Sequence, residues 1–326
     1  MEVFVSIAMN TIPTIFNERK ISYTILGKNE FDTSEKDISA IILSRGHNYH
    51  LNSVFKNLIK TGFSSIVVIE NSQRNFELEQ LSSQFPSIQF LLPAEKISIG
   101  EMINIGMSEV SSKYVLVTWS DILLQNNIFN LKITEQLNNE KYIAAAPILF
   151  DIKKNNIPVQ IVPAISGKDF FTEPFVCKQN LVKTLYLYDF VGIYNRNKFL
   201  QLGGFDYTII NPHWQNLDFN FRTYLWGYEN IILNTFKMNY ESQLTAEDIS
   251  VDDSYFLFYL KNLAVNIGKK GAYIPNRIFF SYMLRSGLNP FKVYRQFKAT
   301  KNWINMYKHN FQITPHKLIA EWEPVL

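Results

Sequence analysis

Apolar and polar residues alternate along the first part of the chain in blocks that predict strands and helices in turn. Asp37 to Ser44 (DISAIILS) is a short β-branched run between polar residues, which is typical of a buried strand. Leu51 to Gly62 then has apolar residues at helical spacing and ends at a glycine. The alternation continues with expected strands at 64–72, 87–92 and 113–121 and expected helices at 76–85 and 99–112. Buried strands alternating with amphipathic helices predict an α/β fold with a doubly wound, mainly parallel sheet.

The second half of the chain has a looser pattern. We expect a strand at 141–151, then a strand, a short helix and a Gly-Gly turn within 190–206. Asn211 to Glu229 (NPHWQNLDFNFRTYLWGYE) predicts a helix that begins near Asn211-Pro212 and stops near Gly227. Its expected buried stripe consists of Leu217, Phe221, Tyr224 and Leu225. From about Ser254 onward the chain is expected to be helical, aromatic and basic.

Polar side chains follow the predicted strands at the points where the strands end. Because ligands of open α/β sheets bind at the carboxyl ends of strands, these side chains are the first candidates for a site. The residues are Ser44, Arg45, Glu70, Asn71, Ser120 and Asp121, and Asn104 lies on a helix expected to face the same edge. Asp121 is suited to hold a divalent ion, with a turn or helix cap as the alternative role.

A second group of candidates surrounds the start of the helix expected at 211–229. Asp206 precedes it, and His213, Trp214, Gln215 and Asn216 lie at its mouth. Asp218 and Arg222 are four residues apart, so we expect them to form an exposed pair that shapes the pocket mouth. The amides at 215 and 216 stand where a catalyst often carries carboxylates.

The order of these motifs resembles the family 2 glycosyltransferases and, more broadly, the GT-A nucleotide-sugar transferases. The similarity covers about Asp37 to Asn239 and includes the strand ends, the segment leading to Asp121, and the Gly-Gly-Phe-Asp block before the helix. The resemblance implies a nucleotide-sugar donor, a glycan or lipid-linked acceptor, and Mn²⁺ or Mg²⁺ as cofactor. It implies donor binding by Ser44, Arg45, Glu70, Asn71, Asn104 and Ser120, and metal binding by Asp121. It places Asp206, His213, Trp214 and Arg222 on the acceptor side and Gln215, Asn216 and Asp218 at the catalytic helix.

Three positions depart from the family pattern. Trp119 replaces the first acid of the metal motif, Gln215 replaces a Glu, and Asn216 replaces the acid that usually acts as base. Because an amide cannot accept a proton at neutral pH, Asn216 cannot be a general base. The retaining polypeptide N-acetylgalactosaminyltransferases carry Glu-Asn before a similar helix, so a retaining-like transferase is one interpretation. A catalytically inactive sugar- or nucleotide-binding descendant is the second, and an unrelated nucleotide-binding α/β protein is the third.

Composition narrows the class of protein. The 326 residues are 47% hydrophobic with a formal net charge of +3, which favours a packed globular chain over a disordered one. The single cysteine, Cys177, excludes a disulfide framework and is expected to serve packing. The N-terminal stretch lacks the basic region of a signal peptide, and no run is long enough for a membrane helix. We expect a soluble or peripheral protein of the cytoplasm.

The charge is unevenly distributed. Ser254 to Ala320 contains no Asp or Glu but eleven Lys and Arg residues. Three interpretations remain open: a solvated helical surface, attachment to an anionic membrane at its inner face, and nucleic-acid binding, which no motif supports. The aromatic residues expected at the membrane are Phe256, Phe258, Tyr259, Tyr282, Tyr294, Phe297, Trp303 and Tyr307. We expect a lead-in at 1–36, a catalytic-type domain at 37–245 and a basic extension at 246–326.

Overall fold

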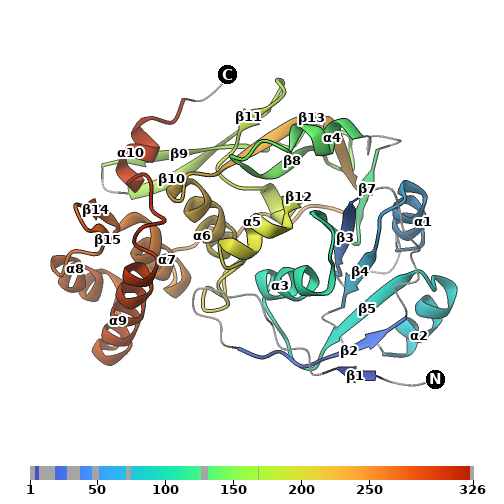
Figure 1. Ribbon diagram of the computed structural model, residues 1–326, viewed down its shortest axis with the longest axis horizontal. Coiled ribbons are helices and arrows are strands. Elements are labelled where there is room, and N and C mark those ends of the chain that lie inside the picture. Colours follow the sequence, from blue (N-terminus) through green and yellow to red (C-terminus); the bar gives the residue numbers. More distant parts are fainter. Residues whose placement is uncertain are drawn as a thin grey trace.

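A central mixed sheet organises the molecule (Figure 1). The computed structural model describes residues 4–6, 19–27, 37–45, 51–70, 75–125, 131–167 and 169–323. In spatial order the sheet contains β1 (Phe4–Ser6), β2 (Tyr23–Leu26), β5 (Ile88–Pro93), β4 (Ile66–Ile69), β3 (Ile38–Leu43), β6 (Tyr114–Trp119), β12 (Gly192–Asn195), β8 (Tyr142–Phe150), β13 (Glu229–Tyr240) and β11 (Val182–Lys183). An additional strand, β7 (Ile122–Leu124), pairs with β13.

Strand direction confirms the predicted fold class. Strands β5, β4, β3 and β6 are mutually parallel neighbours. The antiparallel strand β12 separates β6 from β8, and β13 then runs parallel to β8. Every residue of β3, β4 and β6 is buried, as expected for parallel strands covered on both faces.

Helices connect and cover the strands. Those before the C-terminal part are α1 (Leu51–Thr61), α2 (Asn75–Gln84), α3 (Ile99–Glu109), α4 (Leu131–Gln136), α5 (Arg196–Gln201) and α6 (Pro212–Leu225). A one-turn 3₁₀ helix, η1 (Tyr188–Phe190), precedes β12. The expected helices at 51–62, 76–85, 99–112 and 211–227 are therefore confirmed, with ends shifted by a few residues.

Several strands were not predicted. The long strand β13 follows α6, and the hairpin of β9 (Gln160–Ser166) and β10 (Asp169–Phe175) forms a separate two-stranded sheet. The four residues expected as the buried stripe of α6 are buried, but burial is not limited to one stripe, because all of residues 213–225 are buried. This helix is enclosed by α3, β13 and the C-terminal elements.

The C-terminal elements gather at the end of the molecule opposite β1 and β2 (Figure 1). They are α7 (Asp253–Phe258), the π-helix η2 (Tyr259–Leu263), β14 (Asn266–Gly268), β15 (Gly271–Tyr273), α8 (Arg277–Ser286), α9 (Pro290–Met306) and α10 (Pro315–Ala320). The predicted helical character is confirmed, apart from the small β14–β15 hairpin. Within the part of the chain that the structure describes, no helix is both long and apolar enough to cross a bilayer.

The predicted boundaries at 36/37 and 245/246 stay predictions, but contacts cross both of them. Strand β2 belongs to the expected lead-in and yet pairs with β5 of the central sheet. In the expected extension, Lys261 forms ion pairs with Asp206 and Asp218.

Candidate functional site

The ends of β3 and β6 lie side by side at the carboxyl edge of the sheet. Leu43 is paired with Trp119 in the parallel ladder, so the residues that follow them are neighbours. The backbone N–H of Ser120 donates to the carbonyl of Leu43 at 3.0 Å, and the backbone N–H of Arg45 donates to Ser120 Oγ at 3.2 Å. The predicted proximity of these two strand ends is thus present in the structure.

The Arg45 guanidinium lies among aromatic and acidic side chains at this edge. It stacks over the Trp119 ring at 4.1 Å from the ring centroid, pairs with Asp189, and places Nε 3.8 Å from Asp121 Oδ1. Tyr240 donates a 2.6 Å hydrogen bond to Asp189 Oδ2. We call Arg45, Trp119, Asp121, Asp189 and Tyr240 the Arg45 cluster. Burial disfavours the charged guanidinium, but Asp189 and Asp121 outweigh it and raise the pKa of Arg45.

Asp189 is a member of this cluster that was not predicted from the sequence. Its backbone is in the left-handed region with φ +54°, and Phe190 follows with φ +63°. Trp119 Nε1 donates to the carbonyl of Asp189 at 2.9 Å, which helps to hold this conformation. Burial raises the pKa of the Asp189 carboxyl, although Arg45 and Tyr240 act in the opposite direction. The sequence feature that could have indicated Asp189 is its position as a lone acid inside the aromatic run LYLYDF.

Asp121 was predicted to hold Mn²⁺ or Mg²⁺, and its surroundings test that prediction. Its Oδ2 accepts from Ser242 Oγ, while its Oδ1 is buried without a hydrogen-bond partner among the described residues. Magnesium and manganese prefer several oxygen ligands. In the described chain no three His, Cys, Asp or Glu residues converge on a possible ion, and the Arg45 guanidinium lies against the one carboxylate oxygen that remains. These residues do not fit a divalent ion while Arg45 keeps this position, so the metal stays a prediction.

The other predicted donor-side residues are placed differently. Glu70 follows β4 and is buried, with its backbone N–H donating to Leu91 O at 3.0 Å. Asn71 lies outside the described residues. The amide of Asn104 on α3 makes two hydrogen bonds to the backbone of Phe205. Asn104 Nδ2 donates to the Phe205 carbonyl at 2.8 Å, and Asn104 Oδ1 accepts from the Phe205 N–H at 3.0 Å. The side chain of Asn104 therefore positions a turn beside α6.

Gly204 is needed at this turn. Its φ is +67°, and a Cβ there would lie 2.5 Å from Asn104 Oδ1. Its carbonyl accepts a 2.6 Å hydrogen bond from Arg222 Nη2. The Gly-Gly-Phe-Asp block thus connects α3 to α6 through backbone groups.

The side-chain amides of Gln215 and Asn216, at the start of α6, form hydrogen bonds to backbone groups of neighbouring segments. Gln215 Oε1 accepts from the N–H of Gly100 at 2.8 Å, and its Nε2 donates to Asp206 O at 2.9 Å. Asn216 Nδ2 donates to Leu187 O at 2.8 Å. Both side chains are at most 1% exposed. The predicted catalytic roles of Gln215 and Asn216 stay predictions, and the geometry assigns both amides to holding the helix in place.

A buried ionic cluster joins α6 to the C-terminal elements. Asp218 Oδ2 accepts from Arg222 Nη1 and from Lys261 Nζ, each at 2.7 Å, and Lys261 also donates to Asp206 Oδ2 at 2.9 Å. Asn262 donates to Asp218 Oδ1 at 2.7 Å. We call Asp206, Asp218, Arg222 and Lys261 the ionic cluster; all four are at most 1% exposed.

The ionic cluster corrects one prediction. The Asp218–Arg222 pair is present, but the expectation of an exposed pair at a pocket mouth is wrong, because both side chains are buried. Burial raises the pKa of Asp218, yet Lys261 and Arg222 together outweigh burial and lower it. Asp218 is therefore an ionised, fully paired carboxylate.

His213 and Trp214 border a pocket of about 530 Å³ between α6, β10 and α7. It is lined by Asp169, Phe170, Phe171, Thr172, Ile249, Val251, Tyr255, Phe256 and Arg285. Glu247 Oε2 accepts from Tyr186 at 2.8 Å and lies 3.4 Å from His213 Nδ1. Burial, followed by Glu247 and Asp189, raises the pKa of Tyr188 to about 12.

Comparison with solved structures identifies the fold. GalNAc-T7, crystallised with UDP, GalNAc and Mn²⁺, matches with a TM-score of 0.63 and 12% identity, over 87% of this chain and 56% of that one. The chain has the GT-A fold. It spans just over half of the GalNAc-T7 chain, and at this identity the likeness concerns the fold alone.

Two further structures are similar at TM-scores below 0.5. S. aureus TarS matches at 0.49 with 10% identity, over 82% of this chain and 43% of that one. The mannosyltransferase PcManGT of Pyrobaculum calidifontis was crystallised with GDP-Man and Mn²⁺. It matches with a TM-score of 0.47 and 9% identity, over 87% of this chain and 78% of that one. No protein-family model matches the sequence, and no curated protein does. Assignment to glycosyltransferase family 2 stays a prediction.

Proposed function

We propose that this chain binds a nucleotide sugar at the carboxyl edge of its sheet and transfers the sugar to an acceptor. The observation that carries the proposal is the Arg45 cluster, where a guanidinium and two carboxylates converge between the ends of β3 and β6. Ligands of open α/β sheets bind at this edge. The GT-A fold supports a nucleotide sugar as the ligand, and GalNAc-T7 was crystallised with UDP.

In this proposal Arg45 supplies positive charge to the donor diphosphate. Its side chain is 20% exposed, so a ligand at the edge can reach it. A guanidinium offers several N–H donors in a planar fork, which suits phosphate oxygens. Ser44 and Ser120 contribute polar groups beside it, and Glu70 at the end of β4 contacts the ribose or base.

The transfer step is proposed to be retaining-like. Asn216 cannot take a proton, and Asp218 is occupied by Lys261 and Arg222, so neither is available as a general base. In a front-face transfer, the departing phosphate oxygen accepts the proton of the acceptor hydroxyl while the new glycosidic bond forms. This route needs no carboxylate at position 216.

The pocket bordered by His213 and Trp214 is proposed to take the acceptor. Aromatic side chains from α6, α7 and β10 form its walls, and Arg285 and Asp169 supply polar groups. Such walls suit the apolar faces of sugar rings in a glycan or lipid-linked acceptor. For a lipid-linked acceptor, we propose a place at the inner face of the cytoplasmic membrane.

A second candidate function is a non-catalytic nucleotide- or sugar-binding protein. The observation that favours it is the internal use of Gln215 and Asn216, whose amides hold α6 against Gly100, Asp206 and Leu187. Under this alternative the edge binds a nucleotide, but nothing is transferred.

The proposal is tested by thermal unfolding with UDP-, GDP-, CMP- and dTDP-sugars. A ligand present at about a hundred times its Kd stabilises the folded state by about 2.7 kcal/mol, so a matching donor should raise the Tm clearly. Lys60→Ala, which removes an exposed charge on α1, is the control for Arg45→Ala. We expect the donor-induced shift to persist in the Lys60 variant and to disappear in the Arg45 variant. If no nucleotide sugar shifts the Tm of the unmodified chain, the proposal that it binds a sugar donor is wrong, and a shift that persists in Arg45→Ala would place the donor site elsewhere.

A further inference from the structure

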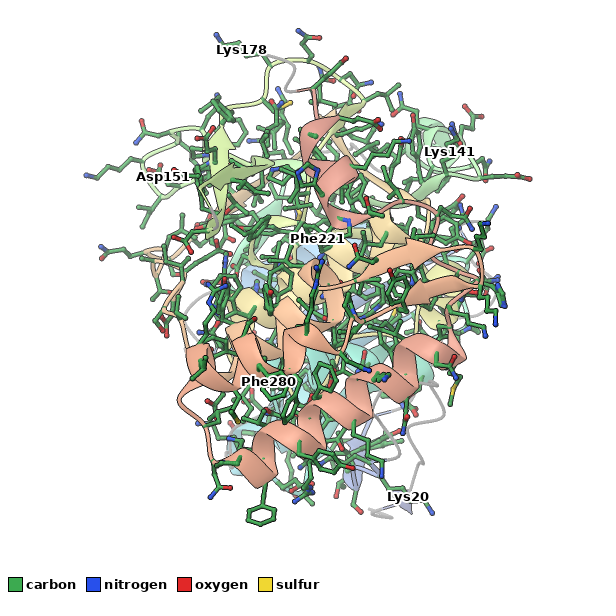
Figure 2. The ribbon with its side chains drawn as sticks, turned by 90° about the vertical axis from the view of Figure 1, so that its left-hand side faces the viewer. Lys20, Lys141, Asp151, Lys178, Phe221 and Phe280 are labelled. Atoms are coloured by element: carbon green, nitrogen blue, oxygen red, sulfur yellow. The ribbon has the colours of Figure 1, made fainter. Side chains whose placement is uncertain are left out.

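Large apolar side chains are exposed at the turn between α8 and α9. Leu284 is 80% exposed and lies three residues before Gly287, and Phe291 is 82% exposed and directly follows Pro290. Phe280, one turn before Leu284 on α8, is 64% exposed. Because the two helices pack on each other around a short turn, these side chains are close to the tip of one helical hairpin. Figure 2 faces this end of the molecule, with α9 crossing the front and Phe280 labelled.

Basic residues lie behind the apolar tip on the same helical stripes. On α9, Arg295 and Lys298 follow Phe291 by four and seven residues, which places them one and two turns further from the tip. On α8, Arg277 precedes Phe280 by three residues. At 1.5 Å per residue, Lys298 is roughly 10 Å along the helix from Phe291. Arg277, Arg295 and Lys298 are all exposed.

This order of side chains matches the depth profile of a lipid surface. Apolar side chains of interfacial helices enter about 5–10 Å into the boundary between headgroups and acyl chains, and basic side chains meet the lipid phosphates above them. The stretch from Ser254 to Ala320 contains no acid that would repel an anionic surface. The nearest acids lie beside the tip, and each is paired with a basic residue of the hairpin: Asp253 with Lys292, and Asp169 with Arg285.

We infer that the tip of the α8–α9 hairpin docks on the surface of an anionic lipid membrane. Leu284 and Phe291 enter the boundary region, with Phe280 beside them, while Arg295, Lys298 and Arg277 contact phosphates. This docking surface is confined to the tip of the α8–α9 hairpin, whereas the sequence indicated the whole basic stretch from Ser254 to Ala320. Of the aromatic residues expected at the membrane, Phe258, Tyr282, Phe297 and Trp303 are buried in the core, and Tyr294 is the exposed one on α9.

The docking surface does not depend on the proposed transferase activity. Charge complementarity is the argument for lipid over a second copy of this chain, because two such basic hairpins would repel each other. A self-association site would instead need the two tips to approach with like charges in contact.

The test is co-sedimentation of the full chain with vesicles of phosphatidylglycerol and phosphatidylcholine at a ratio of 1:1, beside vesicles of phosphatidylcholine alone. We expect binding to the anionic vesicles that weakens when NaCl is raised from 0.1 to 0.5 M, because salt screens the phosphates. The double variant Leu284→Ser/Phe291→Ser should lower the partition coefficient more than tenfold. Arg295→Gln/Lys298→Gln should also lower it, and should flatten the salt dependence.

Ile152→Ser is the matched control, since Ile152 is 55% exposed in a loop after β8. It should leave vesicle binding unchanged, and circular dichroism should show that all variants keep the fold. Equal binding to neutral and anionic vesicles, or no binding to either at 0.1 M NaCl, would overturn the inference. So would concentration-dependent dimerisation that the Leu284→Ser/Phe291→Ser variant abolishes in the absence of vesicle binding.

Discussion

Lys261 Nζ lies 2.7 Å from Asp218 Oδ2, and both side chains are fully buried. The two residues come from different parts of the chain, α6 and η2, and Asp206 and Arg222 complete a cluster with two charges of each sign. A buried charge is tolerated when partners of opposite sign surround it. The ionic cluster therefore ties the C-terminal elements to α6 and to the turn before it.

Removing one carboxylate should destabilise the fold strongly. Asp218→Asn leaves Arg222 and Lys261 with Asp206 as the one remaining carboxylate of the cluster, and breaking a buried ion pair costs roughly 3–5 kcal/mol. The double variant Asp218→Asn/Lys261→Met removes one charge of each sign and should recover most of that loss. Urea unfolding of the three proteins measures the difference. A double variant that is less stable than Asp218→Asn alone would show that charge balance is not what holds the cluster.

The cluster should also give a specific pH dependence. Because Lys261 and Arg222 lower the pKa of Asp218 below its unfolded value, its ionised form stabilises the folded chain above about pH 4. That contribution is lost as the pH falls through the lowered folded pKa. The free energy of unfolding of the unmodified chain should therefore fall faster below about pH 4 than that of the double variant. If the free energies of unfolding of the two proteins fell in parallel over this pH range, Asp218 would not be the group whose ionisation stabilises the fold.

Restoring carboxylates at the mouth of α6 should not create an active base. Asn216→Asp would place a carboxylate oxygen against the carbonyl of Leu187, and Gln215→Glu would do the same at Asp206 O. Each change leaves a buried polar group without its donor, which costs roughly 1–3 kcal/mol or more. We expect lower unfolding midpoints and no gain in turnover. If Gln215→Glu/Asn216→Asp instead raised turnover roughly 10²–10⁴-fold, the range of a general base, the chain would be an inverting enzyme that had lost the carboxylate acting as its base.

Chelation should leave donor binding intact. Arg45 lies against Asp121 where the resemblance expected Mn²⁺ or Mg²⁺, so a guanidinium already supplies positive charge there. Titration calorimetry with UDP and GDP should give the same affinity in EDTA and in Mn²⁺, and Arg45→Ala should weaken binding about tenfold or more. Lys60→Ala serves as the charge-matched control. Binding that appears with Mn²⁺ and vanishes in EDTA would return the cation role to a metal at Asp121.

The parallel half of the fold could be predicted because its signals are local. Runs such as ISAIIL and YVLVTW are buried at every position, and each is bounded by polar residues at its end. Strand β13 escaped prediction because Asn230, Asn234, Lys237 and Asn239 interrupt its apolar residues. Asn230 is nevertheless fully buried, since its amide pairs with Asn220 and Leu185 across the fold.

The site was harder to predict because its partners are distant in sequence. Ser44, Arg45, Ser120 and Asp121 follow from strand ends alone, whereas Asp189 reaches Arg45 across 144 residues. Lys261 resembled one more charge of a basic surface, and its acidic partners lie 43 and 55 residues away. Neither pairing leaves a spacing signal in a single sequence.

The Arg45 cluster is proposed to bind a nucleotide sugar whose sugar is then transferred. The most direct measurement is release of nucleoside diphosphate from the donor that raises the Tm most, with the unmodified chain beside Arg45→Ala and Lys60→Ala. We expect steady release by the unmodified chain and by Lys60→Ala, and a rate at least tenfold lower in Arg45→Ala. Equal rates in all three proteins, or no release by any of them from a donor that binds, would contradict it.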